Sequence, residues 1–141
     1  MTEKFDNKAV YLDTAPLIYY MEEKAIGFQF LQNLFQKNEK GDFIFFTSTI
    51  TLSEVLALPF KLGNHSLADQ YEYFITKSPS LKLVDVNTDI AKRAAQMRFE
   101  YNLKLPGAIH IGTALEVKAD YFLTNDLSLD KVKGLNIITP V

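Results

Sequence analysis

The run "AVYLD" (residues 9–13), followed at once by "TAPLIYYME" (residues 14–22), decides the fold class of this chain. The first stretch is a continuous apolar run that ends on an acid, and the second has the length of a short helix. Strands that are apolar at successive positions are typical of parallel sheets with both faces covered. The two runs therefore predict a buried strand that leads straight into a helix, with Asp13 at the junction.

The alternation of short apolar runs and helical segments continues along the chain. Further strands are predicted at residues 43–48, 81–86, 121–124 and 135–139. Helices are predicted at residues 28–38, 48–60, 66–76, 87–101 and 103–117, and Pro59 is expected to end or bend the second of these. This order predicts an α/β fold with a mainly parallel central sheet, although the pattern does not indicate the order of the strands.

Length and composition indicate one soluble domain over residues 1–141. The chain is long enough to bury its own core, and the absence of cysteine excludes disulfide scaffolds and thiolate metal sites. The N-terminal stretch is too polar for a signal peptide, and no apolar run approaches the length of a membrane span, so we expect a cytoplasmic protein without membrane contact. With a net charge of −2, a nuclease would need local basic residues or metal ions to offset substrate phosphates.

Two acids lie where predicted strands end. Asp13 closes the first strand and Asp126 follows "YFLTN". In open α/β sheets the chemistry gathers beyond the carboxyl ends of the strands, so both are candidate site residues. Each also has a purely structural interpretation, because Asp13 is suited to cap the helix that begins near Thr14 and Asp126 is suited to a turn.

Glu54 is a third candidate, since it lies on an unusually apolar helix. Its neighbours one turn away include Ile50, Ala57 and Leu58, and the next basic residue downstream is Lys61. A carboxylate in these surroundings loses hydration, which is costly unless a cation or hydrogen bonds compensate. Glu54 therefore either faces water at an edge or receives a partner, such as a side chain or a metal, from elsewhere in the fold.

Asp13, Glu54 and Asp126 together would suit a hard cation. Mg²⁺ and Mn²⁺ prefer oxygen ligands, keep several waters and are often completed by substrate phosphate. Such a site activates a water and stabilises an in-line displacement at phosphorus.

Four segments resemble, in order, the motif regions of PIN-domain ribonucleases, most closely those of the VapC-type toxins of toxin–antitoxin pairs. They are "VYLDTAPLIYY", "TSTITLSEVLALP", "LKLPGAIHIGTAL" and "YFLTNDLSL", and the resemblance runs from about Val10 to Ile138. It implies a three-layer α/β/α sandwich and Mg²⁺- or Mn²⁺-dependent hydrolysis of RNA phosphodiesters. It also implies an antitoxin partner and a homodimer.

The resemblance assigns roles by position. Asp13, Glu54 and Asp126 match the family's catalytic and metal-binding acids, and Thr124 matches a polar residue that supports the last acid or holds a water. The third motif departs from the family, because relatives carry Asp where this chain has Gly107. The departure predicts weakened metal binding and reduced ribonuclease activity.

Several alternatives remain open at this level. His110, three residues after Gly107, serves packing or hydrogen bonding, or else replaces the missing acid; Asp130 reads as part of a solvated turn. Phe28, Phe35, Tyr71 and Phe74 belong either to the core or to a dimer or antitoxin interface.

Two further functions compete with the ribonuclease. One is a catalytically defective PIN-like module that binds RNA or a protein partner, which Gly107 motivates. The other is a phosphotransferase with Asp13 as nucleophile. Haloacid-dehalogenase-like enzymes would show a second Asp two residues on, where this chain has Ala15.

Overall fold

The computed structural model describes residues 3–23 and 27–140, and within them the strands form one five-stranded parallel sheet. The strands are β1 (Ala9–Leu12), β2 (Ile44–Ser48), β3 (Leu81–Val84), β4 (Tyr121–Leu123) and β5 (Asn136–Ile138). Their order in the sheet is β3-β2-β1-β4-β5, and every neighbouring pair is parallel. The predicted strands and the parallel sheet are confirmed.

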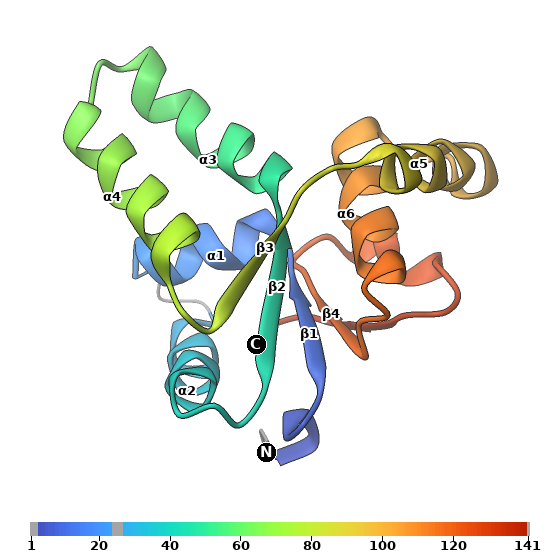
Figure 1. Cartoon of the computed structure of the whole chain (residues 1–141), viewed down its shortest axis with the longest axis horizontal. Helices are drawn as coiled ribbons and strands as arrows, with labels where there is room; N and C mark the ends of the chain where they lie inside the picture. Colours follow the sequence, from blue (N-terminus) through green and yellow to red (C-terminus); the bar gives the residue numbers. More distant parts are fainter. Residues whose placement is uncertain (1–2, 24–26, 141) are drawn as a thin grey trace.

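Helices cover both faces of this sheet, which confirms the three-layer α/β/α architecture. They are α1 (Thr14–Met21), α2 (Phe28–Glu39), α3 (Thr49–Lys61), α4 (His65–Lys77), α5 (Thr88–Tyr101) and α6 (Leu105–Glu116). Figure 1 shows α1 to α4 on one side of the strands and α5 and α6 on the other. The helix α3 continues past Pro59 and ends two residues later. The short 3₁₀ turns η1 (Glu3–Phe5) and η2 (Leu127–Lys131) were not predicted.

Alternation along β1 divides the core into two clusters. Val10 and Leu12 are buried against residues of α1 to α4, whereas Tyr11 is buried on the opposite face, against α5 and α6. Successive side chains of a strand point to opposite faces, so a strand covered on both sides must be apolar throughout. This is the physical reason for the continuous apolar run in "AVYLD".

One glycine sets how closely α5 and α6 pack. A Cβ atom on Gly112 would lie 3.2 Å from the backbone nitrogen of Ala94 and 3.3 Å from the carbonyl oxygen of Ile90. The two helices approach each other through this position, where any side chain would push them apart. Gly112 thereby helps to place α6, which also carries Gly107 and His110.

The topology also explains where a site can form. The chain passes from β1 to β2 and β3 on one side, then crosses to β4 and β5 on the other side of β1. The crevice beyond the carboxyl end of β1 is therefore the switch point at which open α/β sheets bind ligands.

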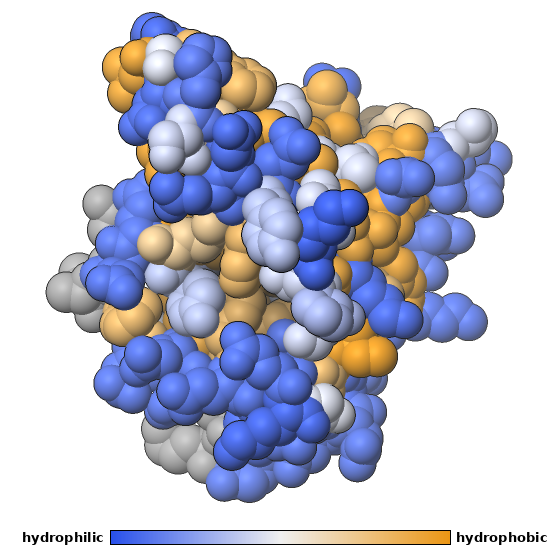
Figure 2. All heavy atoms as spheres, turned by 60° about the vertical axis from the view of Figure 1, so that its left-hand side comes forward, coloured by the Kyte–Doolittle hydropathy of each residue, from blue (hydrophilic) through white to orange (hydrophobic). Residues whose placement is uncertain are grey.

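The outer surface is mixed in character. Figure 2 shows apolar side chains among hydrophilic ones at the end of the molecule where α3 and α4 meet, and Leu58, Phe60 and Leu62 are exposed there. Phe35 and Tyr71 are buried in the core, while Phe28 and Phe74 are only partly covered. The core interpretation therefore holds for Phe35 and Tyr71. Within the described residues, none of the helices has the length and apolar character needed to cross a membrane.

Candidate functional site

Asp13 lies directly after β1 and has a structural role as well as a place in the crevice. Its Oδ1 accepts a hydrogen bond of 2.8 Å from the backbone nitrogen of Thr14, so it caps α1 as its structural interpretation predicts. Its Oδ2 accepts a bond of 2.7 Å from the hydroxyl of Thr124. The side chain is 14 % exposed. Both oxygens are thus held in place while the carboxylate still lines the cleft.

Glu54 projects from α3, and its carboxylate contacts polar side chains from other elements. Its Oε1 accepts a bond of 2.7 Å from the Thr14 hydroxyl and lies 2.7 Å from Nε2 of His110. Burial disfavours the charged carboxylate, but the hydrogen bonds from His110 and Thr14 and the charge on His110 outweigh it, so the pKa of Glu54 lies below its ordinary value. The side chain is 34 % exposed, which leaves it accessible from the cleft.

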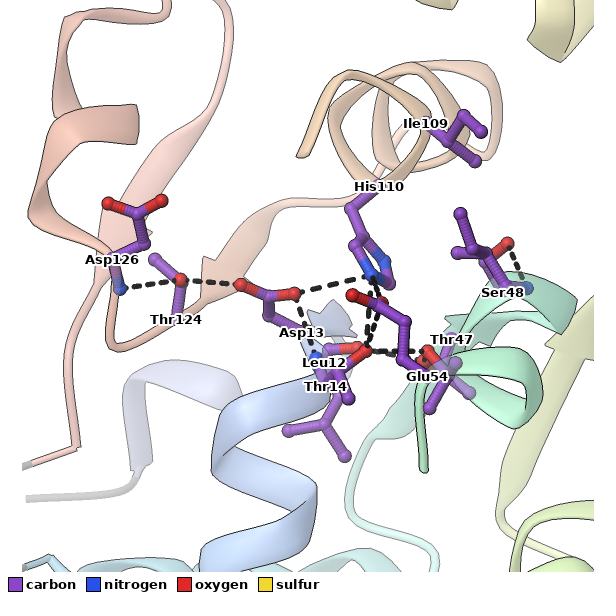
Figure 3. A network of polar contacts seen from close by, with 12 residues as sticks. Leu12, Asp13, Thr14, Thr47, Ser48, Glu54, Ile109, His110, Thr124 and Asp126 are labelled. Atoms are coloured by element: carbon purple, nitrogen blue, oxygen red, sulfur yellow. Dashed lines mark hydrogen bonds and ion pairs between the residues drawn. The ribbon is translucent and has the colours of Figure 1, made fainter. Parts of the chain in front are cut away.

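His110 is the centre of this polar network. Figure 3 shows its ring pointing from α6 into the space between Asp13 and Glu54. Besides Glu54, Nε2 lies 3.1 Å from the Thr14 hydroxyl and 3.4 Å from Oδ1 of Asp13. The ring is 2 % exposed. Of its two interpretations, hydrogen bonding is what the structure shows, and the bonds connect it to the predicted acids themselves.

Tyr11 is a member of the network that the sequence analysis missed. Its hydroxyl lies 2.7 Å from Nδ1 of His110, and its ring stacks on Phe122 with centroids 5.1 Å apart. Burial, together with the negative charge on Asp13, raises the pKa of the Tyr11 phenol well above its ordinary value, so the hydroxyl stays protonated. The available signal was a polar-tipped residue inside the apolar run "AVYLD", two positions before the acid.

Asp126 is held mainly by its own turn. Its Oδ1 accepts bonds from the backbone nitrogen and the hydroxyl of Ser128, at 3.0 and 2.6 Å, and so caps η2. Its backbone nitrogen donates to the hydroxyl of Thr124 at 2.9 Å. Because that buried hydroxyl also donates to Asp13, Thr124 links the two acids.

The three predicted acids line one cleft of about 510 Å³. Gly107, His110, Lys104, Lys131 and Ser128 are among its other lining residues. Asp13 and Glu54 meet at His110, but in the described portion of the chain no three acidic or histidine side chains converge closely enough to hold a metal ion. The structure therefore brings Asp13 and Glu54 together and leaves Asp126 joined to them through Thr124.

Gly107 occupies the third position of α6 and faces the cleft without structural need. Its backbone is helical, and a Cβ atom there would meet only Leu129 Cδ2, at the ordinary contact distance of 3.8 Å. Neither space nor backbone conformation therefore requires a glycine at this position.

A parallel α/β/α domain with acids at its switch point is the arrangement of the PIN class. The family model of the PIN domain matches residues 10–135, and the chain belongs to this family. PIN domains generally use divalent metal ions.

Similar solved structures place the fold among the VapC-type toxins. Three of them are DNA-bound VapBC from Salmonella typhimurium (22 % identity, TM-score 0.77, covering 95 % of this chain and 99 % of that chain), a toxin–antitoxin complex from Klebsiella pneumoniae (21 %, 0.71, 94 % and 98 %) and VapC20 of Mycobacterium tuberculosis, a sarcin-ricin loop cleaving toxin (13 %, 0.69, 90 % and 98 %). No curated protein matches the chain significantly.

The donor atoms of the cleft fit a small divalent cation. Mg²⁺ is usually held by one or two carboxylates and completed by water and substrate phosphate. Asp13 and Glu54 supply two carboxylates that approach the same nitrogen atom of His110, and carboxylate oxygen and imidazole nitrogen are both ligand types for such ions.

Proposed function

We propose that this chain is a metal-dependent endoribonuclease of the PIN/VapC toxin type, with activity reduced by Gly107. The observation that carries the proposal is that Asp13, Glu54 and Asp126 line one cleft at the switch point of a parallel sheet. Hydrolysis of a phosphodiester is the chemistry that such a group of carboxylates serves.

In this proposal Asp13, Glu54 and Asp126 hold Mg²⁺ or Mn²⁺. When bound, such an ion supplies Lewis-acid stabilisation of charge on the phosphodiester and activation of water for its hydrolysis. Thr124 orients Asp13 through its hydroxyl and supports the backbone of Asp126, which is its proposed role at the site. Thr14 and His110 orient Glu54.

Two lysines of the cleft suit an RNA substrate. Lys104 and Lys131 line it beside the acids, and both are exposed. A chain with a net charge of −2 needs such local positive charge to accept phosphates, since its overall field does not attract them. The lysines are therefore assigned to binding the RNA backbone.

The partners follow from the same likeness. The Klebsiella structure that resembles this chain is a toxin–antitoxin complex, which supports a cognate antitoxin for this chain. We further propose that residues 1–141 act as one PIN-like domain, as a homodimer and in the cytoplasm.

Gly107→Asp tests the proposal directly. The fold accepts the new side chain, because a Cβ atom at this position makes only an ordinary contact. We expect Mn²⁺-dependent cleavage of a labelled RNA to rise at least about tenfold, in keeping with the effect of a supporting group at a metal site. Gly107→Asn, similar in size but uncharged, is the matched control and should give a smaller gain.

Two results would contradict this reading. If Gly107→Asp leaves cleavage unchanged, the glycine is not the cause of low activity. If the natural sequence already cleaves RNA rapidly and Asp13→Asn abolishes that cleavage, the missing acid is dispensable here.

A second candidate is a PIN-like module that binds RNA or an antitoxin without cutting. It is favoured by the absence, among the described residues, of three side chains placed to hold a metal. RNA binding by the double variant Asp13→Asn, Glu54→Gln, with no cleavage by any variant including Gly107→Asp, would support it. Metal-dependent cleavage that requires Asp13 would exclude it.

A further inference from the structure

The hydrogen on His110 can be assigned from its neighbours. Oε1 of Glu54 belongs to an ionised carboxylate, which only accepts, so Nε2 of His110 must be the donor over their 2.7 Å contact. The Thr14 hydroxyl donates its single hydrogen to Glu54 at 2.7 Å and therefore accepts from Nε2 at 3.1 Å. Nε2 of His110 therefore carries a hydrogen.

The other ring nitrogen, Nδ1, also requires a hydrogen-bond partner in this buried position. The atom that meets it is the Tyr11 hydroxyl, 2.7 Å away. Tyr11 is fully buried and its ring stacks on Phe122 at an interplanar angle of 9°, so the hydroxyl has little freedom to turn away. Tyr11 lies in β1 and Asp13 directly follows that strand, so the same strand positions both residues.

We propose that Tyr11 is a positioning residue of this site: its hydroxyl holds the His110 ring through Nδ1, so that Nε2 faces Glu54 and Asp13 and keeps both carboxylates turned toward a common point. The proposal rests on the proposed function only for its catalytic consequence. The positioning itself concerns Tyr11, His110 and the two carboxylates, whatever the site acts on. Partners that orient the ligands of a metal typically influence affinity or activity by 10–100-fold.

The histidine ring reports directly on this arrangement. The chain contains two histidines, and His65, exposed at the start of α4, provides an internal reference for His110. In ¹⁵N NMR of the metal-free protein, we expect His110 to carry a proton on Nε2. If the spectrum shows a proton on Nδ1 alone, Nε2 does not donate to Glu54 and the proposal is wrong.

The variant Tyr11→Phe removes the hydroxyl and preserves the stacked ring. We expect the His110 signals to shift away from those of the natural sequence, with those of His65 unchanged. Mn²⁺ affinity measured by calorimetry should fall about 10-fold or more, and kcat for RNA should fall with KM nearly constant. His110 signals identical to those of the natural sequence would overturn the proposal.

Tyr71→Phe is the matched control. It also removes a buried tyrosine hydroxyl bonded to a carboxylate, that of Glu22 at 2.6 Å, in the other core cluster. Its loss should leave the His110 signals and Mn²⁺ affinity as they are, and an equal effect of both variants would mean that Tyr11 acts only through general stability. The NMR result does not depend on cleavage: a protein that cuts no RNA but shows the expected His110 signals refutes the ribonuclease while the positioning role stands.

Discussion

At the scale of single residues, His110 has two roles at once, packing in the core and hydrogen bonding. It is buried as a packing residue is, yet both of its nitrogens are engaged, one with Tyr11 and the other with Glu54. A buried polar group of this kind is stable only if every partner is present. By contrast, nothing in the surroundings of Gly107 requires a glycine at that position.

The lowered pKa of Glu54 predicts a pH dependence of stability. A carboxyl whose pKa is depressed on folding contributes stability above its ordinary value, here 4.5, and that contribution is lost as the pH falls through the folded value. We therefore expect the advantage of the natural sequence over Glu54→Gln to shrink as the pH falls below about 5 and through the lowered pKa of Glu54. Urea unfolding of both proteins at a series of pH values, in the presence of a chelator, measures this difference in the free energy of unfolding.

The background His110→Gln provides the control for this pH dependence. It removes the ring that lowers the pKa of Glu54, so the dependence should weaken there. A difference between the natural sequence and Glu54→Gln that stays constant with pH would contradict the argument.

At the scale of elements, α6 contains two glycines with opposite requirements. Gly112 lies against the backbone of α5, whereas a Cβ atom on Gly107 would make only an ordinary contact with Leu129. The same substitution should therefore have opposite effects at two positions only five residues apart in one helix.

Gly112→Ala should destabilise the protein by about 1–3 kcal/mol, because the added methyl group overpacks the contact with α5. Gly107→Ala should be neutral or stabilise by up to about 1 kcal/mol, since alanine is the better helix former. Chemical denaturation of both variants measures the contrast. Equal effects at the two positions would show that the close approach of α5 and α6 is not what selects Gly112.

At the scale of the whole molecule, an acidic protein must gather positive charge locally to bind RNA. Replacing Lys104 and Lys131 by Gln should weaken binding of a single-stranded RNA. The slope of the logarithm of the affinity against the logarithm of the salt concentration should become shallower by about 0.7 for each lost phosphate contact. Fluorescence anisotropy in a chelator, with cleavage prevented, measures both quantities.

The double variant Lys40→Gln, Lys61→Gln is the control, because it changes the net charge equally at residues that do not line the cleft. If it weakens RNA binding as much as the cleft variant does, binding depends on total charge and the assignment of Lys104 and Lys131 is wrong.

Local sequence patterns were sufficient to predict the helices, the strands and the class of fold. Apolar runs such as "AVYLD" and the helical segments between them are patterns over a few residues, so the strands and helices could be located from local sequence. The same local character identified Asp13 and Asp126 as residues that follow strands.

Which of these residues lie close together depends on how the strands and helices pack. The order β3-β2-β1-β4-β5 places Asp13 between the segments that carry Glu54 and Asp126, and no local pattern contains that order. Tyr11 and His110 are 99 residues apart in the chain, so their bond exists only once α6 packs on β1. Sequence periodicity reports which side of an element is buried, whereas hydrogen-bond partners depend on how buried sides are brought together. For this reason the acids could be predicted one by one, and the network that orients them could not.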